Sequence, residues 1–426
     1  MERYSEYKDS GEQWLGEIPS HWEVRKMKYI FRERSEKGYP NEPLLAATQN
    51  HGVICKSSYE NRTVEASKGL DTLKLVEKGD FVISLRSFQG GLEYAYDRGI
   101  ISPAYTILQP IHILSDYFKY LAKSTIYISL LRSVVTGIRE GQNIDYSKLK
   151  EYLLQIPPQD EQVMIGKHLD RVTSQLDEAI AQQQRMIDLL NERKQIIIQH
   201  AVTKGLDPNA EMVESGVEWI GMMPKGWKAT PLRFVFEIRN GYTPSKNDPS
   251  FWTNGTIPWY RMEDIRKNGR ILKEAHQYVT RKAVNGKGTF SAGSYIMAIC
   301  TASIGEHAML IADSLANQRF ANFKIYQSLS DKYLPMFLFY YFYVIGDFCR
   351  HNENSTCFQY VDMPALKRFP ILMPSIEEQQ KIVEFLDSNL AYLNKSLQQI
   401  EHRITLLRER KQIIINEVVT GKVKVS

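Results

Sequence analysis

The side chains of this chain that could carry chemistry are polar and aromatic residues in short loops beside β-rich segments. Arg, Lys, Asn and Gln can hydrogen-bond base edges in the major groove of DNA, while Lys, Ser and Thr can hold phosphates. For any single residue, a solvated loop or a structural hydrogen bond is the alternative. The candidates in the first half are Gln49, Asn50, Lys56, Arg86, Ser87, Gln89, Tyr105, Arg139, Gln142 and Asn143. Those in the second half are Tyr242, Thr243, Ser245, Lys246, Trp259, Arg261, Asn317, Gln318, Arg319, Gln359 and Tyr360.

No catalytic motif accompanies these residues. The chain contains no GxGxxG, GxxxxGK[ST], HExxH or GxSxG. The pair Pro157-Pro158 is followed by Gln159-Asp160, which fits the start of a helix and not the catalytic loop of a DNA methyltransferase. The 9 histidines are dispersed, and the 4 cysteines have no metal-ligand spacing. We therefore predict no catalytic residue, cofactor or metal on this chain.

The elements that must position the candidates occur twice. The segment Glu-Arg-Lys-Gln-Ile-Ile-Ile at 192–198 returns unchanged at 409–415, an offset of 217 residues. Closer to the N-terminus, Ser10-Gly11 and Trp14 recur at 215–216 and 219, an offset of 205. The chain is thus two copies of one plan, a variable body followed by a fixed helix, and the second body is 12 residues longer.

Each body is predicted to be mixed α/β. In the first, 79–85 and 100–108 are expected to form strands and 118–135 a helix. In the second, strands are expected at 293–299 and 320–326 and a helix at 333–348. The predicted parts are a first body at 1–156, a helical spacer at 157–205, a second body at 206–373 and a second spacer at 374–426.

Each spacer begins at a proline and continues with acidic residues, a pattern typical of a helix N-terminus. About 40 residues at ~1.5 Å per residue give a rod of roughly 60 Å. Apolar residues at coiled-coil spacing predict that the two helices pack on each other in antiparallel fashion, with Gln183 and Asn389 as polar interruptions. The alternative is that each helix packs on its own body. The predicted seam consists of Ile165, Leu169, Leu176, Leu190, Ile197, Ile382, Leu386, Leu393, Ile400, Leu407 and Ile414.

Composition sets broad limits. A chain of 426 residues, 43% hydrophobic and 24% charged, is typical of a globular protein with two or more domains. No apolar run reaches the ~18 residues that a membrane span needs, and the scattered thiols fit a reducing cytoplasm. The net charge of +5 arises mainly in the second body and is weak support for a nucleic-acid partner.

The duplicated order resembles the specificity (S) subunit of type I restriction-modification systems, HsdS. Each body opens with Trp-(Leu/Ile)-Gly-x-(Ile/Met)-Pro-x-x-Trp, leads into its helix through Pro-x-x-(Asp/Glu)-Glu-Gln, and the helix carries the repeated motif near its end. The segments at 241–246, 257–259, 317–318 and 419–423 are also similar to that family. Each motif is weak alone, but together they cover essentially the whole chain.

The resemblance implies a non-catalytic, cytoplasmic DNA reader with two target-recognition domains, each reading one half of a bipartite, asymmetric double-stranded DNA site. The helices would set the gap and dock two modification (M) subunits, which bind S-adenosylmethionine. Restriction (R) subunits would add ATP- and Mg-dependent cleavage. An assembly scaffold whose bodies bind protein, and an enzyme with an unrecognised methyltransferase or nuclease site, are the alternatives.

Overall fold

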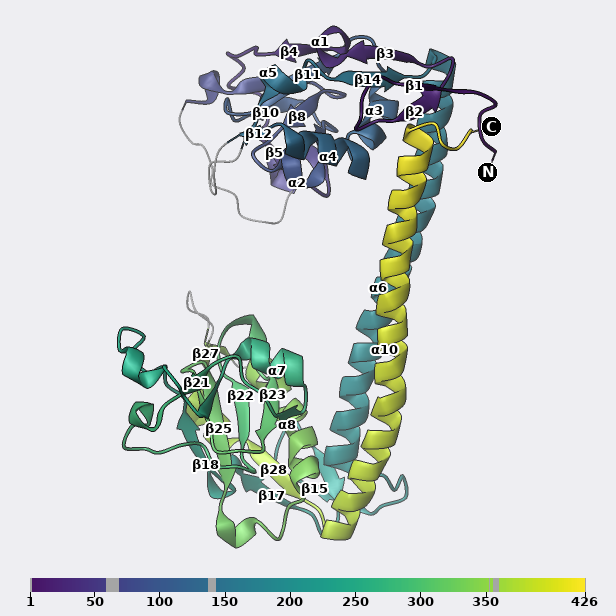
Figure 1. Cartoon of the computed structure of the whole chain (residues 1–426). Coiled ribbons are helices and arrows are strands. Elements are labelled where there is room, and N and C mark those ends of the chain that lie inside the picture. The colour runs from purple at the N-terminus through teal and green to yellow at the C-terminus, as the bar shows by residue number, and fades with distance from the viewer. Residues whose placement is uncertain (1, 59–68, 137–142, 352, 355–359, 426) are drawn as a thin grey trace. The chain divides into compact units, whose positions relative to one another are not determined.

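The computed structural model describes residues 2–58, 69–136, 143–351, 353–354 and 360–425. The chain forms two compact units (Figure 1). Unit 1 consists of Met1–Arg185 and Glu401–Ser426, and unit 2 of Met186–Ile400. Two long helices, α6 (Gln159–Lys204) and α10 (Ile376–Val419), each have one end in unit 1 and the other end in unit 2. Mixed helix and sheet, two domains and long helices were all expected from the sequence.

The body of unit 1 is built on a four-stranded antiparallel sheet in the order β4-β11-β8-β9, with shorter ladders around it. Its strands are β1 (Tyr7–Asp9), β2 (Glu17–Pro19), β3 (Glu23–Lys26), β4 (Phe31–Arg34), β5 (Leu45–Thr48), β6 (Gly52–Cys55), β7 (Lys74–Val76), β8 (Phe81–Ile83), β9 (Glu93–Tyr94), β10 (Gly99–Ile101), β11 (Thr106–Pro110), β12 (Val135–Thr136), β13 (Asn143–Ile144) and β14 (Leu153–Ile156). Its helices are α1 (Met27–Ile30), α2 (Ser87–Gly90), α3 (Ser115–Leu121), α4 (Thr125–Ser133) and α5 (Tyr146–Leu149).

The body of unit 2 repeats this plan around a five-stranded sheet in the order β18-β25-β22-β23-β20. Its strands are β15 (Met212–Glu214), β16 (Met222–Pro224), β17 (Lys228–Pro231), β18 (Phe236–Asn240), β19 (Ile257–Tyr260), β20 (Ile271–Leu272), β21 (Tyr278–Val279), β22 (Tyr295–Ala298), β23 (His307–Leu310), β24 (Leu315–Ala316), β25 (Phe320–Ile325), β26 (Glu353–Asn354), β27 (Tyr360–Val361) and β28 (Pro370–Met373). Its helices are α7 (Met262–Asn268), α8 (Pro335–His351) and α9 (Met363–Arg368).

The central strands and two of the smaller ladders correspond between the two bodies. The central strand β8 pairs with β11 and β9, and its counterpart β22 pairs with β25 and β23. The small ladder β12-β13 corresponds to β26-β27, and β3-β14 corresponds to β17-β28. The expected strands at 79–85, 293–299 and 320–326 are confirmed as β8, β22 and β25. The apolar run at 100–108 forms β10 and β11, separated by a turn at Pro103.

One predicted element was wrong. The segment 118–135 was expected to be a single helix, but the structure has α3 and α4, separated by 122–124. The side-chain oxygen of Ser124 accepts a hydrogen bond from the backbone N–H of Tyr127 at 3.2 Å and thereby starts a new helix. In a continuous helix the Tyr127 N–H would donate to a backbone carbonyl one turn earlier. Because the Ser124 side chain accepts this hydrogen bond instead, the apolar run is divided into two helices.

A tryptophan joins the helix ends to the body in each unit. The indole N–H of Trp22 donates to Glu161 Oε2 at the start of α6 (2.9 Å), and the ring lies against Gly421, just beyond the end of α10. In unit 2, Trp227 donates to Glu378 at the start of α10 (3.2 Å) and lies against Gly205, just beyond α6. In both units the start of one helix therefore meets the end of the other, so the pair is antiparallel. Gly205 and Gly421 both have φ +74°, the left-handed conformation that commonly ends a helix.

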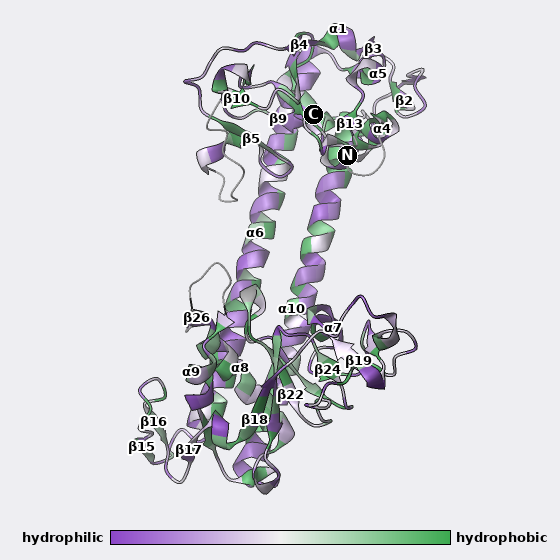
Figure 2. Cartoon of the chain, turned by 90° about the vertical axis from the view of Figure 1, so that its left-hand side faces the viewer, coloured by the Kyte–Doolittle hydropathy of each residue, from purple (hydrophilic) through white to green (hydrophobic). Residues whose placement is uncertain are grey.

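All the predicted seam residues are buried or half-buried. Figure 2 shows hydrophobic residues recurring along both helices between hydrophilic ones. Near the bodies the seam merges with the body cores, so the helices pack on each other and on the bodies. Ile165 and Leu169 share one core cluster with Ile414 and the sheet of unit 1. Asn389 is not in the seam, because it is exposed and bonds the Phe385 carbonyl of its own helix.

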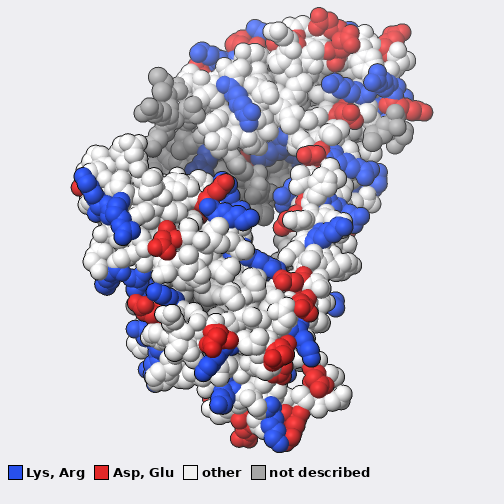
Figure 3. Space-filling view, turned by 60° about the horizontal axis from the view of Figure 1, so that its bottom comes forward, with Lys and Arg blue, Asp and Glu red and all other residues white. Residues whose placement is uncertain are grey.

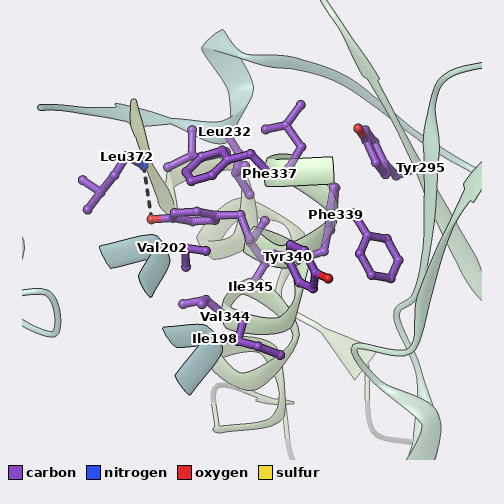
Figure 4. Packing of buried hydrophobic residues seen from close by; sticks show 14 of the residues in the cluster. Ile198, Val202, Leu232, Tyr295, Phe337, Phe339, Tyr340, Val344, Ile345 and Leu372 are labelled. Atoms are coloured by element: carbon purple, nitrogen blue, oxygen red, sulfur yellow. Dashed lines mark hydrogen bonds between the residues drawn. The ribbon is translucent and has the colours of Figure 1, made fainter. Parts of the chain in front are cut away.

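The core of unit 2 is rich in aromatic residues from α8. Phe337, Tyr340 and Ile345 are buried in the same hydrophobic cluster as Ile198 and Val202 of α6, and Figure 4 shows the packing of this cluster. The buried Tyr341 hydroxyl accepts the Leu372 N–H at 3.2 Å and links α8 to β28.

Unit 1 closes its core with residues far apart in the chain. The Tyr117 hydroxyl and the Gln155 amide both donate to the Val419 carbonyl, at 3.1 and 3.0 Å. The Lys424 N–H also donates to the Glu2 carbonyl at 2.8 Å. The last helical turn of α10 is therefore an integral part of the first body.

Candidate nucleic-acid interface

In unit 2, four of the predicted side chains lie at one end of the sheets. Arg261 follows β19, Asn317 and Arg319 precede β25, and these three line a cavity of about 220 Å³. Cys300 follows β22, lines the same cavity and pairs through its backbone with Tyr360 of β27. Segments separated by up to 100 residues therefore bring their polar side chains to one surface.

Arg261 is the residue best placed to act at this cavity. Its guanidinium is half-buried and contacts Glu263 at 2.9 Å, but its buried Nε has no hydrogen-bond partner among the described residues. The backbone N–H of Arg261 donates to Asp264 Oδ2 (2.7 Å), and this buried carboxylate also binds the backbone N–H of His276 (2.8 Å). The loop is thus held in place while part of the guanidinium fork remains available to an acceptor. A planar fork of this kind matches the O6 and N7 acceptors of guanine.

Other predicted residues of unit 2 differ in exposure. The Thr243 hydroxyl donates to the Gln318 side chain, which places both beside Asn317. Ser245 and Lys246 are exposed in the loop that follows. Trp259 is only 3% exposed, and its indole donates to the Tyr242 carbonyl at 3.1 Å, so its contacts support the loop from below.

The Tyr242 hydroxyl is used within the protein. It donates to the Ala283 carbonyl and accepts the Asn285 N–H at 2.9 Å. The Tyr242 hydroxyl therefore both donates and accepts a hydrogen bond within the protein, and these two bonds fix the loop conformation.

In unit 1, a second group of predicted residues surrounds α2. The Gln49 amide donates to the Arg86 carbonyl at 3.4 Å, and the exposed Arg86 and Gln89 lie at α2. Asn50 is exposed next to Gln49, and the exposed Asn143 lies on β13, which contacts α2.

Three predicted residues of unit 1 do not join this group. Ser87 is fully buried, and its hydroxyl oxygen accepts the Ser84 N–H at 2.8 Å, so it stabilises the turn. Lys56 and Tyr105 line a separate cavity of about 330 Å³ beside β5 and β10. The predicted residues Arg139, Gln142 and Gln359 lie outside the described residues.

The two groups occupy equivalent places in the repeated plan. Gln49 follows β5 as Arg261 follows β19, and Arg86 follows β8 as Cys300 follows β22. Asn143 begins β13 as Tyr360 begins β27, at the offset of 217 residues. The framework is therefore shared, but the side chains that it presents differ. This arrangement is suited to hydrogen-bonding two different ligands of the same general shape.

The contacts that anchor each body to the start of its long helix are equivalent in both units. Gln162 Oε1 accepts the Leu114 N–H at 2.8 Å, and its Nε2 donates to the Pro157 carbonyl at 2.8 Å. Its counterpart Gln379 accepts the Leu334 N–H at 2.8 Å and donates to the Pro374 carbonyl at 3.1 Å. Equivalent contacts therefore attach both bodies to their helices, whereas the side chains of the two candidate surfaces differ.

The face drawn in Figure 3 carries both positively and negatively charged side chains. Figure 3 shows Lys and Arg interspersed with Asp and Glu on both units. Burial raises the pKa of Glu93 to about 7, against the opposing influence of Lys123, whose ammonium lies 2.7 Å away. Within the described ranges, no group of three or more His, Cys, Asp or Glu is arranged to hold a metal ion. No described helix is long and apolar enough to cross a membrane.

Sequence reasoning missed a set of basic residues next to Gln49 and Asn50. Lys123 of unit 1 and Lys411 of α10 line a cavity of about 750 Å³ together with those two residues and Arg408. The available signal was Lys411 itself, which belongs to the repeated Glu-Arg-Lys-Gln-Ile-Ile-Ile motif.

Three comparisons with known proteins agree with this organisation. The chain is 42% identical over 178 residues to the Escherichia coli type I restriction enzyme EcoprrI specificity subunit, covering 40% of this chain and 42% of that protein. It is 23% identical over 450 residues to the putative type I restriction enzyme MjaX specificity subunit of Methanocaldococcus jannaschii, covering 96% of both.

A solved chain from a study of complex assembly and conformational transition of the type I R-M system superposes with a TM-score of 0.68 at 14% identity. The superposition covers 95% of this chain and 99% of that one, and it shows a shared fold. Residues 19–186 and 224–406 match the family described as the type I restriction modification DNA specificity domain. The chain, with its two equivalent bodies and antiparallel helices, therefore belongs to the type I restriction-modification DNA specificity family.

Proposed function

We propose that each body reads one half of a bipartite double-stranded DNA site, through the surface around α2 in unit 1 and the surface around Arg261 in unit 2. The observation that carries this proposal is the repeated framework with different side chains at equivalent positions. A shared framework suits two stretches of the same double helix, and different side chains suit two different base sequences. The two half-sites are therefore expected to be non-identical.

The chain contributes recognition and not catalysis in this proposal, as expected of a specificity subunit. Two modification subunits carrying S-adenosylmethionine would methylate the site in the cytoplasm. Restriction subunits would supply the ATP- and Mg-dependent steps. The helices α6 and α10 would dock the modification subunits and set the gap between half-sites. The carbonyl and indole contacts that fix both helix ends to the bodies support this role, because a spacer must be rigidly attached to both readers.

The test uses the chain assembled with its modification subunits and a pool of random-sequence DNA duplexes. The expected result is enrichment of one motif with two specified halves and an unspecified gap of constant length. Enrichment of a single continuous motif, or of none, contradicts the proposal. The scaffold alternative predicts tight protein assembly without any sequence enrichment.

A matched pair of variants then assigns the halves. Arg261→Gln should change the preference in one half, and Arg86→Gln should change the preference in the other. If both variants alter the same half, the assignment of one half to each body is wrong.

A further inference from the structure

Unit 1 contains a cavity where its body meets the two long helices, here called the unit 1 cavity. It has a volume of about 750 Å³. The body contributes Gln49, Asn50 and Lys123 to its lining, and α10 contributes Arg408 and Lys411. The loop of Gln49 and Asn50, which is proposed above to read bases, therefore lines the same cavity as Arg408 and Lys411 of α10.

Unit 2 contains a cavity of about 390 Å³ at the equivalent place, here called the unit 2 cavity. Its helical lining includes Lys194 of α6 and Asn394 of α10. These residues lie 217 positions from Lys411 and Asp177, which line the unit 1 cavity. The repeated motif therefore places the same lysine in the same kind of hollow twice.

The cations of the unit 1 cavity are only partly neutralised. Lys411 contacts Asp177 at 2.6 Å, but the Asp177 side chain is 57% exposed, so this pair contributes little and is easily exchanged. Lys123 contacts the buried Glu93. Arg408 is exposed and has no ion-pair partner among the residues that the structure describes.

In the unit 2 cavity the acidic partner is replaced by an amide. Lys194 donates to Asn394 Oδ1 at 3.0 Å, and this neutral group does not neutralise the lysine charge. Burial and the nearby Arg270 both lower the pKa of Lys194. An anion entering the cavity would oppose both effects, because an opposite charge favours the protonated ammonium.

We propose that the two cavities bind phosphates of the DNA backbone, through Arg408 and Lys411 in unit 1 and through Lys194 in unit 2. This inference rests on the proposed function. The sugar–phosphate backbone is the same at every half-site, whereas the bases differ. Correspondingly, the motif lysine is the same in both cavities, whereas the body residues around it differ. Phosphate contacts fix the register of the protein on the duplex without reading sequence.

The test measures binding of the assembled complex to its own site and to a scrambled duplex of equal length, between about 0.05 and 0.2 M salt. The plot of log K against log salt has a negative slope, and loss of one phosphate contact makes this slope shallower by about 0.9. At about 0.1 M salt the same loss weakens binding about eightfold. Arg408→Gln and Lys194→Gln should each show this change equally on both duplexes. The preferred motif should stay unchanged.

Matched controls carry the same loss of charge on the same helices. Arg403→Gln on α10 and Arg193→Gln on α6 remove exposed residues that do not line either cavity. They should leave the slope unchanged.

Three outcomes overturn the proposal: a wild-type slope in Arg408→Gln and Lys194→Gln, a changed motif, or weakened modification-subunit binding with an unchanged slope, which would make the cavities protein-docking sites. If instead the wild-type complex enriches no bipartite motif, the proposed function fails, a result independent of the slope.

Discussion

Replacing Gln162 by leucine tests how the first body is anchored to its helix. Gln162 is 4% exposed at the start of α6, and it bonds the backbone N–H of Leu114 and the carbonyl of Pro157, both at 2.8 Å. Leucine has nearly the same size but cannot make either bond. Two backbone groups that connect α3 and β14 to α6 would lose their partner.

The expected cost follows from these two groups. An unpaired buried donor or acceptor costs about 1–3 kcal/mol. The Leu114 N–H is only partly buried, and the leucine side chain recovers about 1 kcal/mol of apolar burial. The net loss is therefore about 1–4 kcal/mol, or roughly 2–16 °C in the unfolding temperature of a unit of this size.

Urea unfolding measures this loss, and hydrogen exchange of the Leu114 amide reports it locally. The control is Gln182→Leu, which makes the same change at an exposed position of α6 and should stay within about 0.5 kcal/mol of wild type. If Gln162→Leu and Gln182→Leu are equally stable, and the Leu114 amide exchanges at the wild-type rate, then this anchor does not hold the body on the helix.

Three further outcomes can be checked. Arg261→Gln should relax one base position of one half-site by about 1–3 kcal/mol in a selection experiment, and a uniform loss on all sequences would make Arg261 a phosphate contact instead. A Cβ at Gly241 would lie 2.2 Å from the Asn317 carbonyl oxygen, so Gly241→Ala should displace that loop and abolish recognition of the same half only; a retained motif would contradict this. Burial raises the pKa of Glu93 from 4.5 to about 7, so the folded state holds this proton more tightly than the unfolded state does. The wild type should therefore lose stability relative to Glu93→Gln as pH rises from about 4.5 to 7, and parallel urea-unfolding profiles would refute this.

The helices were predictable because their information is local. Apolar residues at helical spacing determine which face is buried, and this needs no knowledge of the rest of the fold. Leu176 and Leu407 are half-buried as the spacing requires. The break at Ser124 was not predictable in this way. Apolar residues at helical spacing occur both before and after Ser124, and this pattern does not reveal that the Ser124 side chain caps a new helix.

The candidate surface was only partly predictable. Polarity identified Arg261 and Arg319 as candidates. That both line one cavity could not be predicted, because it depends on strand pairing between segments distant in the chain. Trp259 was a candidate as an aromatic residue beside a β-rich segment, yet its aromatic side chain is buried in the core. Lys123 was missed because only the packing of the first body on α10 brings it next to Arg408.

The closure of unit 1 by residues of α10 has a consequence for synthesis. Tyr117 and Gln155 bond to Val419, whereas unit 2 is built from one continuous stretch. On the ribosome, the second body can complete its fold while the first still lacks part of its core. The N-terminal half therefore matures last, and it spends most of translation with apolar surface that chaperones can recognise.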